Sequence, residues 1–407
     1  MGIEKAFPGK SLKRTHREII IIISFNIYHI EKKMGLLVDE ASCECTTSSL
    51  EWFDVLPTQT TIAKSTWSEY QPLGSLSNDS DIVEFYVSPE VNEYMDLKNS
   101  YMRVKFRIMA KDGTACKDTD KVAPINDTFN GIWKNVELFL NDRLVSQSNS
   151  CHGYIAMLKT LLFSTEEAVT SQKTNQLFFK DTPGQLDCTN PFLPNDAKVI
   201  PGWSRKQDED YAVINTDVRN NGLHKRYLYT QTSTVTEMVG PLPLDLFEQV
   251  RYIPNGVKMK LRFEKQRNPF VLMSPVETFK FELMSVNLYI RKVTPSPGVL
   301  LGHAQALTKG TAKFPITRTT CSVISVSQGH SSNTEDNMFL GQLPKTLVIG
   351  MVADDAFTGS FNRNPYYFKS FDLRSLVLTA NGVIVPGTPL KLDRNDSAAV
   401  FYQTMFH

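Results

Sequence analysis

The histidines and cysteines of this chain are the residues that could bind a metal or act as a nucleophile. Its seven histidines form no HxH, HxxxH or HExxH spacing, which would place two imidazoles on one metal ion; they are residues 16, 29, 152, 224, 303, 330 and 407. Cys151 lies beside His152, but a nucleophile and its base must converge in space and be held by a third group. The pattern predicts no metal site and favours a core or capping role for this pair.

The remaining chemical groups also indicate a protein without catalytic function. Asp354 and Asp355 are adjacent carboxylates, but neighbours on a strand point to opposite faces, so a turn role is favoured. Cys43 and Cys45 have a spacing that suits neither a zinc knuckle nor a disulfide. There is no GxxxxGK[ST] motif and no GxGxxG motif that opens a helix. We therefore predict that the protein is not an enzyme and needs no cofactor.

Composition restricts the partners and favours β-structure. The chain has 407 residues and a net charge of +1, from 44 basic and 43 acidic side chains. Such a balance provides no basic field to hold nucleic acid by counterion release, so we predict no specific nucleic-acid partner. The 24 Phe and 14 Tyr residues suit wide pleated faces. The length is typical of two large β-sandwich domains.

The first 33 residues differ from the rest of the chain. A basic stretch is followed by the apolar run 18–30, which is shorter than the roughly 20 residues that cross a membrane. Charged residues and Met34 follow it in place of a cleavage site for a signal peptide. We predict that residues 1–33 are an extension of the gene model, disordered or a short helix, with Met34 as the start. Residues 34–55 are expected to form an N-terminal arm, and no membrane contact is expected.

Hydrophobic periodicity predicts strands along most of the chain. Within the strand predicted at 101–109, residues 102–108 alternate between apolar and cationic side chains, as in a strand with one buried face. The long strand predicted over 279–293 changes phase near Met284 and Ser285, which indicates a bulge. Asn141 and Asp142 predict a tight hairpin. Residues 154–163 change to a helical period, whereas residues 175–227 are interpreted mostly as loops. Further strands are expected at 82–87, 257–263, 321–327, 346–352, 373–379 and 383–385, and a short helix at 299–307.

Two prolines and a glycine between Thr294 and Gly298 predict a domain boundary. We assign residues 56–293 to a first sandwich and 294–407 to a second. The second segment is too short for all the strands that the first can hold. The predicted fold class is therefore all-β, with two consecutive jelly-roll β-sandwiches, a few short helices and an incomplete second roll.

Several motifs of the chain, taken together, resemble the major capsid protein of Polinton/Maverick elements, also called adintoviruses. They are VAPIN (122–126), LFLNDRLVS (138–146), GPLPLDLFEQVRYIPNGV (240–257), RKVTPSPGVLLGHAQAL (291–307), GTAKFPI (310–316), GQLP (341–344), AFTGS (356–360), NP (364–365) and FKSF (368–371). The resemblance covers roughly residue 56 to the C-terminus. It implies a hexon-like double jelly roll. Compared with that family, this chain looks C-terminally truncated, and we predict that it is a fragment or a decayed, integrated copy of a transposable element.

The resemblance also implies partners and a location. Members of that family are inferred to form homotrimers, whose six jelly rolls make a pseudo-hexagonal capsomer that tiles a capsid lattice. A penton-type minor capsid protein would be a second partner. The protein is then expected in the virion capsid, and in the host nucleus or cytoplasm during assembly, without secretion.

Two loops with family-like motifs are the predicted assembly elements, around 245–256 and 354–365. The alternative is that these residues maintain the fold, with the aromatic side chains between sheets. The candidate interface residues are Asp245, Phe247, Arg251, Tyr252, Asp354, Asp355, Phe357, Phe361, Asn364 and Pro365.

A different class of function stays open at this stage. Double β-sandwiches also serve as non-catalytic modules that bind glycans or proteins, and fold alone does not decide between these roles. The cationic rows Arg103, Lys105, Arg107 and Lys258, Lys260, Arg262 could likewise contact an acidic partner or the inner capsid surface, or form solvated outer faces.

Overall fold

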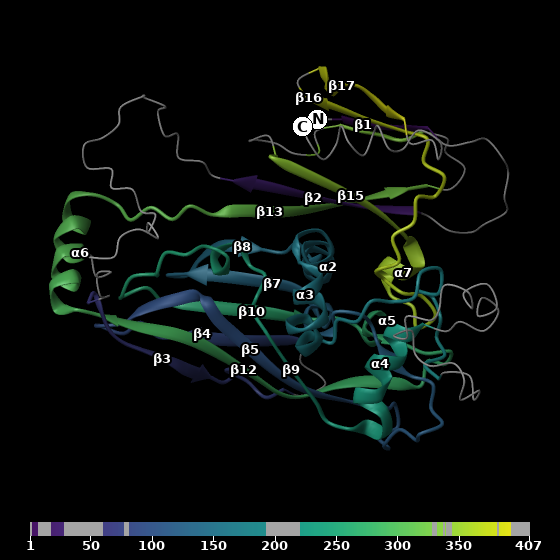
Figure 1. The fold of residues 1–407 in the computed structure, drawn as a ribbon, viewed down its shortest axis with the longest axis horizontal. Coiled ribbons are helices and arrows are strands. Elements are labelled where there is room, and N and C mark those ends of the chain that lie inside the picture. Colours follow the sequence, from purple (N-terminus) through teal and green to yellow (C-terminus); the bar gives the residue numbers. More distant parts are fainter. Residues whose placement is uncertain are drawn as a thin grey trace, which may run out of the picture.

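The computed structural model shows two stacked β-sandwiches joined at one end by a helix, α6 (Pro297–Lys309) (Figure 1). It describes residues 2–6, 18–27, 60–76, 81–192, 220–327, 332–336, 338, 344–380 and 382–391. Within these residues, no helix is long and apolar enough to cross a membrane. The predicted arm at 34–55 lies outside the described residues.

The first sandwich contains eight strands in two antiparallel four-stranded sheets. One sheet has the order β3-β12-β5-β9, and the other has the order β4-β10-β7-β8. The strands are β3 (Ile62–Tyr70), β4 (Ile82–Val87), β5 (Tyr94–Ala110), β7 (Trp133–Leu140), β8 (Arg143–Gln147), β9 (Thr236–Gly240), β10 (Met259–Lys265) and β12 (Phe279–Pro295).

The order of these strands defines a jelly roll. Numbered by their place along the chain, the two sheets read 1-8-3-6 and 2-7-4-5. Successive strands therefore lie in alternate sheets at most steps. The last two strands are inserted between earlier ones, strand eight between one and three and strand seven between two and four. This is the eight-stranded arrangement of two Greek keys.

Alternation of side chains explains why these segments are strands. Met102, Val104 and Phe106 of β5 are fully buried, whereas the residues between them are half-buried. Phe85 and Phe263, from the opposite sheet, are also fully buried and meet edge to face with ring centroids 5.8 Å apart. Each sheet thus contributes one apolar face to a shared core. The burial of this apolar surface is the main favourable contribution to the free energy of folding.

Two local predictions are confirmed in detail. The register of β12 against β5 shifts between Leu283 and Ser285, so the predicted bulge lies at Met284. Asn141 and Asp142 have φ angles of 46° and 64° and connect β7 to β8. Both angles are left-handed, as a two-residue hairpin turn requires.

The second sandwich also has two sheets, β13-β2-β15 and β14-β1-β16-β17. Counted from α6, strands β13 to β17 hold places one to five. Places one and three lie in one sheet and places two, four and five in the other, as they do in the first sandwich. Among the described residues, no strand holds the sixth place. The strands that follow α6 are β13 (Thr317–Val326), β14 (Thr334–Glu335), β15 (Thr346–Ala353), β16 (Ser375–Ala380) and β17 (Val383–Lys391).

The sheet β13-β2-β15 is the middle layer of the molecule, between the first sandwich and the sheet that contains β16 and β17 (Figure 1). Val352 of β15 belongs to the main core, whereas its neighbour Met351 belongs to a smaller core on the other face. A sheet covered on both faces favours continuous apolar runs over alternation, which explains the sequence of β15.

The N-terminal strands correct one prediction. Residues 1–33 were expected to be disordered or a short helix, but β1 (Gly2–Ala6) and β2 (Glu18–Ile27) are strands of the second sandwich. β2 pairs antiparallel with both β13 and β15, and β1 pairs with β14 and β16. The five consecutive isoleucines at 19–23 fit a central strand better than a disordered extension.

Short helices surround the first sandwich. α2 (His152–Phe163) matches the predicted helix at 154–163, and α6 extends the one predicted at 299–307. Residues 177–192 are loops and turns, in line with the loops predicted for most of 175–227, whereas α4 (Asn221–Thr230) is a helix at the end of that segment. The remaining short elements are β6 (Ala123–Pro124), β11 (Leu272–Met273), α1 (Thr128–Gly131), α3 (Glu166–Thr170), η1 (Gln172–Gln176), η3 (Gln231–Ser233), η4 (Asp245–Phe247), α5 (Asn268–Val271) and α7 (Asp354–Thr358).

Helix α4 is fixed by a buried ion pair. Arg226 is fully buried, and its Nη2 donates to Asp181 Oδ1 at 2.9 Å. Its Nε donates to the carbonyl of Pro124 at 2.9 Å, which gives this backbone oxygen of β6 a hydrogen-bond partner. A buried guanidinium is tolerated only with such a complete set of acceptors.

Candidate functional site

Each of the two predicted assembly loops contacts the other sandwich, and we call these contacts together the junction between the sandwiches. The loop that begins with η4 belongs to the first sandwich. The loop that begins with α7 follows β15 of the second (Figure 1). Three sets of contacts hold the junction: a buried carboxylate, a network of ion pairs, and a cluster of aromatic rings.

Asp245 is the buried carboxylate. It is 7% exposed and accepts a hydrogen bond from Ser146 Oγ at 3.2 Å and another from the backbone N–H of Thr319 at 3.1 Å. Thr319 lies on β13, so this side chain ties the second sandwich to the first. Burial raises the pKa of Asp245, and the nearby Lys159 opposes the shift. Two backbone carbonyls complete this contact: Arg318 Nη2 donates to that of Val145 at 2.8 Å, and Arg251 Nη1 to that of Lys313 at 2.5 Å.

Asp187 is the centre of the ion-pair network. Its Oδ2 accepts from Arg363 Nη1 at 3.1 Å and from Lys369 Nζ at 3.3 Å, while its Oδ1 accepts from the backbone N–H of Asn364 at 3.0 Å. Arg363 Nε also donates to Asp355 Oδ2 at 3.0 Å. One carboxylate of the first sandwich therefore fixes three residues of the second.

Aromatic rings fill the space beneath this network. Tyr154 of α2 stacks on Phe357 with centroids 5.6 Å apart. It meets Tyr366 edge to face at 5.6 Å and Phe270 at 5.9 Å. Such ring pairs add stabilisation beyond the area that they bury. Each of the four rings lies more than 100 positions along the chain from at least one partner, so the cluster joins distant parts of the chain.

Glycines allow the close approach of these rings. A Cβ atom at Gly153 of α2 would lie 2.5 Å from Tyr366 Oη, and one at Gly350 would lie 2.9 Å from the Phe368 ring. Gly359 has a φ angle of 99°, and its added Cβ would lie 3.1 Å from the backbone N of Phe270. Larger residues at Gly153 and Gly359 would push the second sandwich away from the first, whereas a larger residue at Gly350 would displace the Phe368 ring within the second sandwich.

Buried ionisable groups lie around the same junction. Burial raises the pKa of Asp127 to about 7 and lowers the pKa of His152 to about 3. A hydrogen bond with the Cys151 thiol, together with burial, raises the pKa of Cys321, so a thiol from each sandwich meets here. Cys151 and His152 are both buried at the start of α2, as their predicted core role requires.

The predicted interface residues separate by burial. Asp245, Phe247, Phe361, Asn364 and Pro365 are buried within one copy of the chain. The half-buried residues are Tyr252, Asp354, Asp355 and Phe357, and Arg251 is exposed. Their observed contacts favour the alternative that they maintain the fold, and a role between copies stays a prediction.

No pattern in the sequence marks the groups that join these loops to the other sandwich. Asp187 lies within the segment interpreted mostly as loops, and Tyr366 carried no signal beyond its aromatic type. Tyr154 begins the predicted helix at 154–163, but nothing in the sequence indicated its partners. A buried carboxylate that binds backbone amides gives no local pattern, because its partners are distant in sequence.

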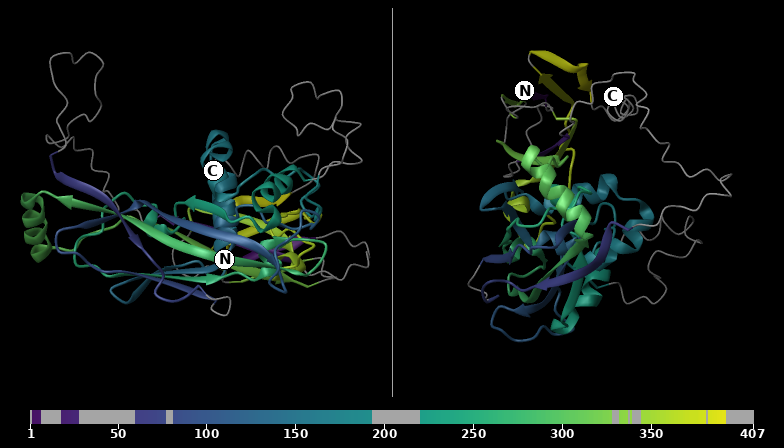
Figure 2. Two further views of the ribbon diagram at one scale, coloured as in Figure 1. Left: turned by 90° about the horizontal axis from the view of Figure 1, so that it is seen from below. Right: turned by 90° about the vertical axis from the view of Figure 1, so that its left-hand side faces the viewer.

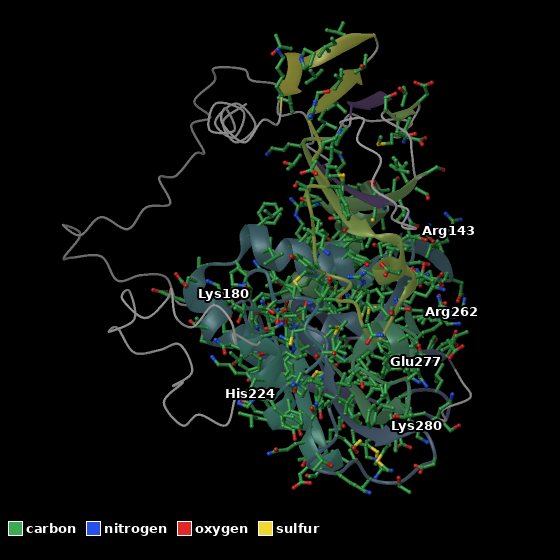
Figure 3. All side chains as sticks on the ribbon, turned by 90° about the vertical axis from the view of Figure 1, so that its right-hand side faces the viewer. Arg143, Lys180, His224, Arg262, Glu277 and Lys280 are labelled. Carbon is green, nitrogen blue, oxygen red and sulfur yellow. The ribbon has the colours of Figure 1, made fainter. Side chains whose placement is uncertain are left out.

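The cationic rows are neutralised by strands beside them. Arg103 Nη2 lies 2.8 Å from Glu237 Oε2, and Arg107 Nε lies 2.7 Å from Glu282 Oε2. Arg262, which lies at the outer margin of the first sandwich (Figure 3), has Glu84 and Glu137 within 3.6 Å. These contacts favour solvated outer faces with cross-strand pairs over an unpaired surface for an acidic partner. Within the described part of the chain, no group of three or more His, Cys, Asp or Glu side chains could hold a metal ion.

No protein-family model matches the chain. An uncharacterized protein of Caenorhabditis elegans is 21% identical over 347 residues, which is 83% of this chain and 74% of that protein. Among solved structures, the Sputnik virophage structure matches with a TM-score of 0.38 and 13% identity, over 65% of this chain and 53% of that one.

Two further solved structures resemble the chain. The mavirus major capsid protein matches with a TM-score of 0.32 and 12% identity, over 65% of this chain and 53% of that one. The Faustovirus major capsid protein matches with a TM-score of 0.33 and 7% identity, over 61% and 57%. The chain thus spans about half the length of these solved proteins.

Proposed function

We propose that the protein is a structural, non-catalytic capsid subunit, the major capsid protein of a Polinton/Maverick-type integrated virus. It assembles as a homotrimer into pseudo-hexagonal capsomers that tile a shell in the virion, with a penton-type minor capsid protein as a further partner. Assembly takes place in the nucleus or cytoplasm of the host cell.

The repeated strand order is the observation that carries this proposal. Places one to five of the second sandwich repeat those of the first, sheet by sheet. The shared junction fixes one sandwich on the other through Asp245 and Asp187. A rigid pair of similar units lets three copies present six similar blocks around one axis, which is the geometry that a pseudo-hexagonal tile requires.

The motifs that resemble the capsid family support the same proposal. Residues 138–146 contain the hairpin between β7 and β8, residues 240–257 contain the loop of Asp245, and the motifs 356–360 and 364–365 lie on either side of Arg363. These motifs therefore lie in or beside the parts that hold the two sandwiches together.

An exposed apolar surface supports association of several copies. Leu161, Leu162 and Phe163, at the end of α2, are 52%, 53% and 63% exposed. We name these three residues the α2 patch. Contiguous exposed apolar residues mark sites of protein contact.

The test is to express the full chain and measure its mass in solution, with electron microscopy of the same sample. We expect trimers with a pseudo-hexagonal outline, or shells. The matched control is the Leu162→Asp variant, in which the α2 patch carries a charge. Folded monomers of the unmodified chain at high micromolar concentration would contradict the proposal, and a glycan-binding screen of those monomers would then examine the binding-module alternative.

A further inference from the structure

A small cavity lies within the junction, between the two sandwiches. Its volume is about 10 Å³, which is close to the space that one water molecule needs. Its wall contains polar side chains from both sandwiches: Ser146 of β8, His152 of α2 and Asp245 of η4 from the first, and Thr319 of β13 from the second. Each of these residues is at most 9% exposed. The size of the cavity therefore restricts its occupant to a single small molecule or ion.

Two polar atoms on this wall are buried without a hydrogen-bond partner. They are Nε2 of His152 and Oγ1 of Thr319, and neither bonds to any residue that the structure describes. A buried imidazole or hydroxyl without a partner lowers stability, because its hydrogen bonds to bulk water are lost on folding. Buried polar groups in proteins are as a rule paired with protein atoms or with ordered water. Two such atoms on the wall of one cavity indicate an occupant that bonds to both.

The charges around the cavity favour a neutral occupant. Burial is the largest influence on the pKa of His152 and of Asp245, and the nearby positive charge of Lys159 lowers the pKa of each. Lys159 would repel a cation in the cavity, and the Asp245 carboxylate would repel an anion. His152, with a pKa of about 3, is neutral at pH 7. Water is neutral and can both donate and accept hydrogen bonds, so it fits the charge as well as the size of the cavity.

We propose that this cavity binds one water molecule, which forms hydrogen bonds with His152 Nε2 and Thr319 Oγ1. The water joins α2 of the first sandwich to β13 of the second. It adds to the direct bond between the sandwiches, in which the backbone N–H of Thr319 donates to Asp245 Oδ1 at 3.1 Å. The site is complete within one copy of the chain, so it is independent of how copies assemble.

The sign of one stability change tests the bound water. Thr319→Val replaces the hydroxyl with a methyl group of similar size. If water is bound, the variant removes one of its hydrogen bonds, and we expect the equilibrium constant for unfolding to rise about fivefold in urea titrations at pH 7. If no water binds, the variant removes a buried hydroxyl that has no partner, and the constant should fall. An unchanged or lower constant would overturn the proposal.

The control for this exchange is Thr278→Val. Thr278 is exposed and does not line the cavity, so this variant reports the effect of the same change in side chain on a solvated position. We expect its unfolding constant to match that of the unmodified protein. An equal rise in both variants would mean that the exchange of threonine for valine, and not the loss of a bound water, weakens the protein.

A high-resolution crystal structure of the full chain locates the occupant directly. We expect a water oxygen about 2.7–3.2 Å from both His152 Nε2 and Thr319 Oγ1, in the unmodified protein and in Thr319→Ser, which keeps the hydroxyl. The water should be lost in Thr319→Val. An atom about 2.1 Å from His152 Nε2 would instead be a metal ion. That result, or no density in the cavity of the unmodified protein, would contradict the proposal.

Discussion

Asp127 and His152 are two buried groups whose titrations change the free energy of unfolding in opposite directions. Asp127 is fully buried with a left-handed φ of 47°, and Asn130 Nδ2 donates to both of its carboxylate oxygens at 3.0 and 3.1 Å. His152 is 1% exposed, and its Nε2 has no hydrogen-bond partner among the described residues. Burial is the main cause of both pKa shifts, upward for the acid and downward for the base.

The signs of the two contributions follow from these shifts. Asp127 has a pKa of about 7 in the folded protein, so its stabilising contribution is complete below about pH 4 and is lost as the pH rises to 7. His152 has a folded pKa of about 3, so its contribution is complete above about pH 6.5 and is lost as the pH falls. Between pH 4 and 6.5 the two slopes have opposite signs, each at most about 1.4 kcal/mol per pH unit.

The Asp127→Asn variant should therefore be more sensitive to acid than the unmodified protein. Asparagine tolerates the left-handed backbone and does not titrate, so the slope of His152 is no longer opposed. We expect the free energy of unfolding to fall more steeply from pH 6.5 to 4, as measured by urea unfolding at several pH values. His152→Gln is the matched control and should change the slope in the opposite direction. Equal slopes in both variants would contradict this assignment.

At the scale of elements, one atom, Tyr366 Oη, decides whether a side chain at Gly153 of α2 fits against the loop after α7. A Cβ at Gly153 would lie 2.5 Å from Tyr366 Oη but 3.6 Å from Tyr366 Cζ, which is ordinary contact. Tyr366 Oη has no hydrogen-bond partner among the described residues. The hydroxyl could thus be removed without breaking a described bond.

Gly153→Ala should weaken the junction, and Tyr366→Phe should restore it. Overpacking costs about 1–3 kcal/mol, which exceeds the gain of up to about 1 kcal/mol from replacing a helical glycine. We expect faster hydrogen exchange in β15 and α7 in the single variant and near-normal exchange in the double variant. Gly302→Ala in α6 is the control, because a Cβ there meets nothing within 4 Å. Failure of Tyr366→Phe to rescue would show that another contact limits the junction.

The elements that could be predicted from the sequence are those with a local cause. The bulge at Met284 follows from a change of phase, and the turn at Asn141 and Asp142 follows from residues that tolerate a left-handed backbone. Helix α4 could not be predicted in the same way, since it buries only a few positions and depends on Arg226 reaching Asp181. The junction was beyond prediction because Arg363 and Asp187 lie 176 positions apart.

At the scale of the whole molecule, α6 and the junction hold the sandwiches at two separate places. Helix α6 lies at one end of the molecule, away from the junction helices α2, α5 and α7 (Figures 1 and 2). None of its residues is buried, and its one described side-chain bond to the body joins His303 Nδ1 to Tyr94 Oη at 2.9 Å. The junction therefore supplies most of the rigidity between the sandwiches, and α6 acts as a spacer.

The α2 patch gives the prediction that concerns the whole assembly. Leu162→Asp places a charge among three exposed apolar side chains, so contact with a second copy would bury an unpaired carboxylate at a cost of several kcal/mol. We expect the concentration at which trimers form to rise at least tenfold, measured by light scattering after size-exclusion chromatography. The melting temperature should hardly change, because Leu162 is already 53% exposed in one copy. Val91→Asp is the control, since Val91 is 81% exposed and lies outside the patch. If both variants weaken trimer formation equally, the added charge and not the α2 patch is the cause, which would contradict the prediction.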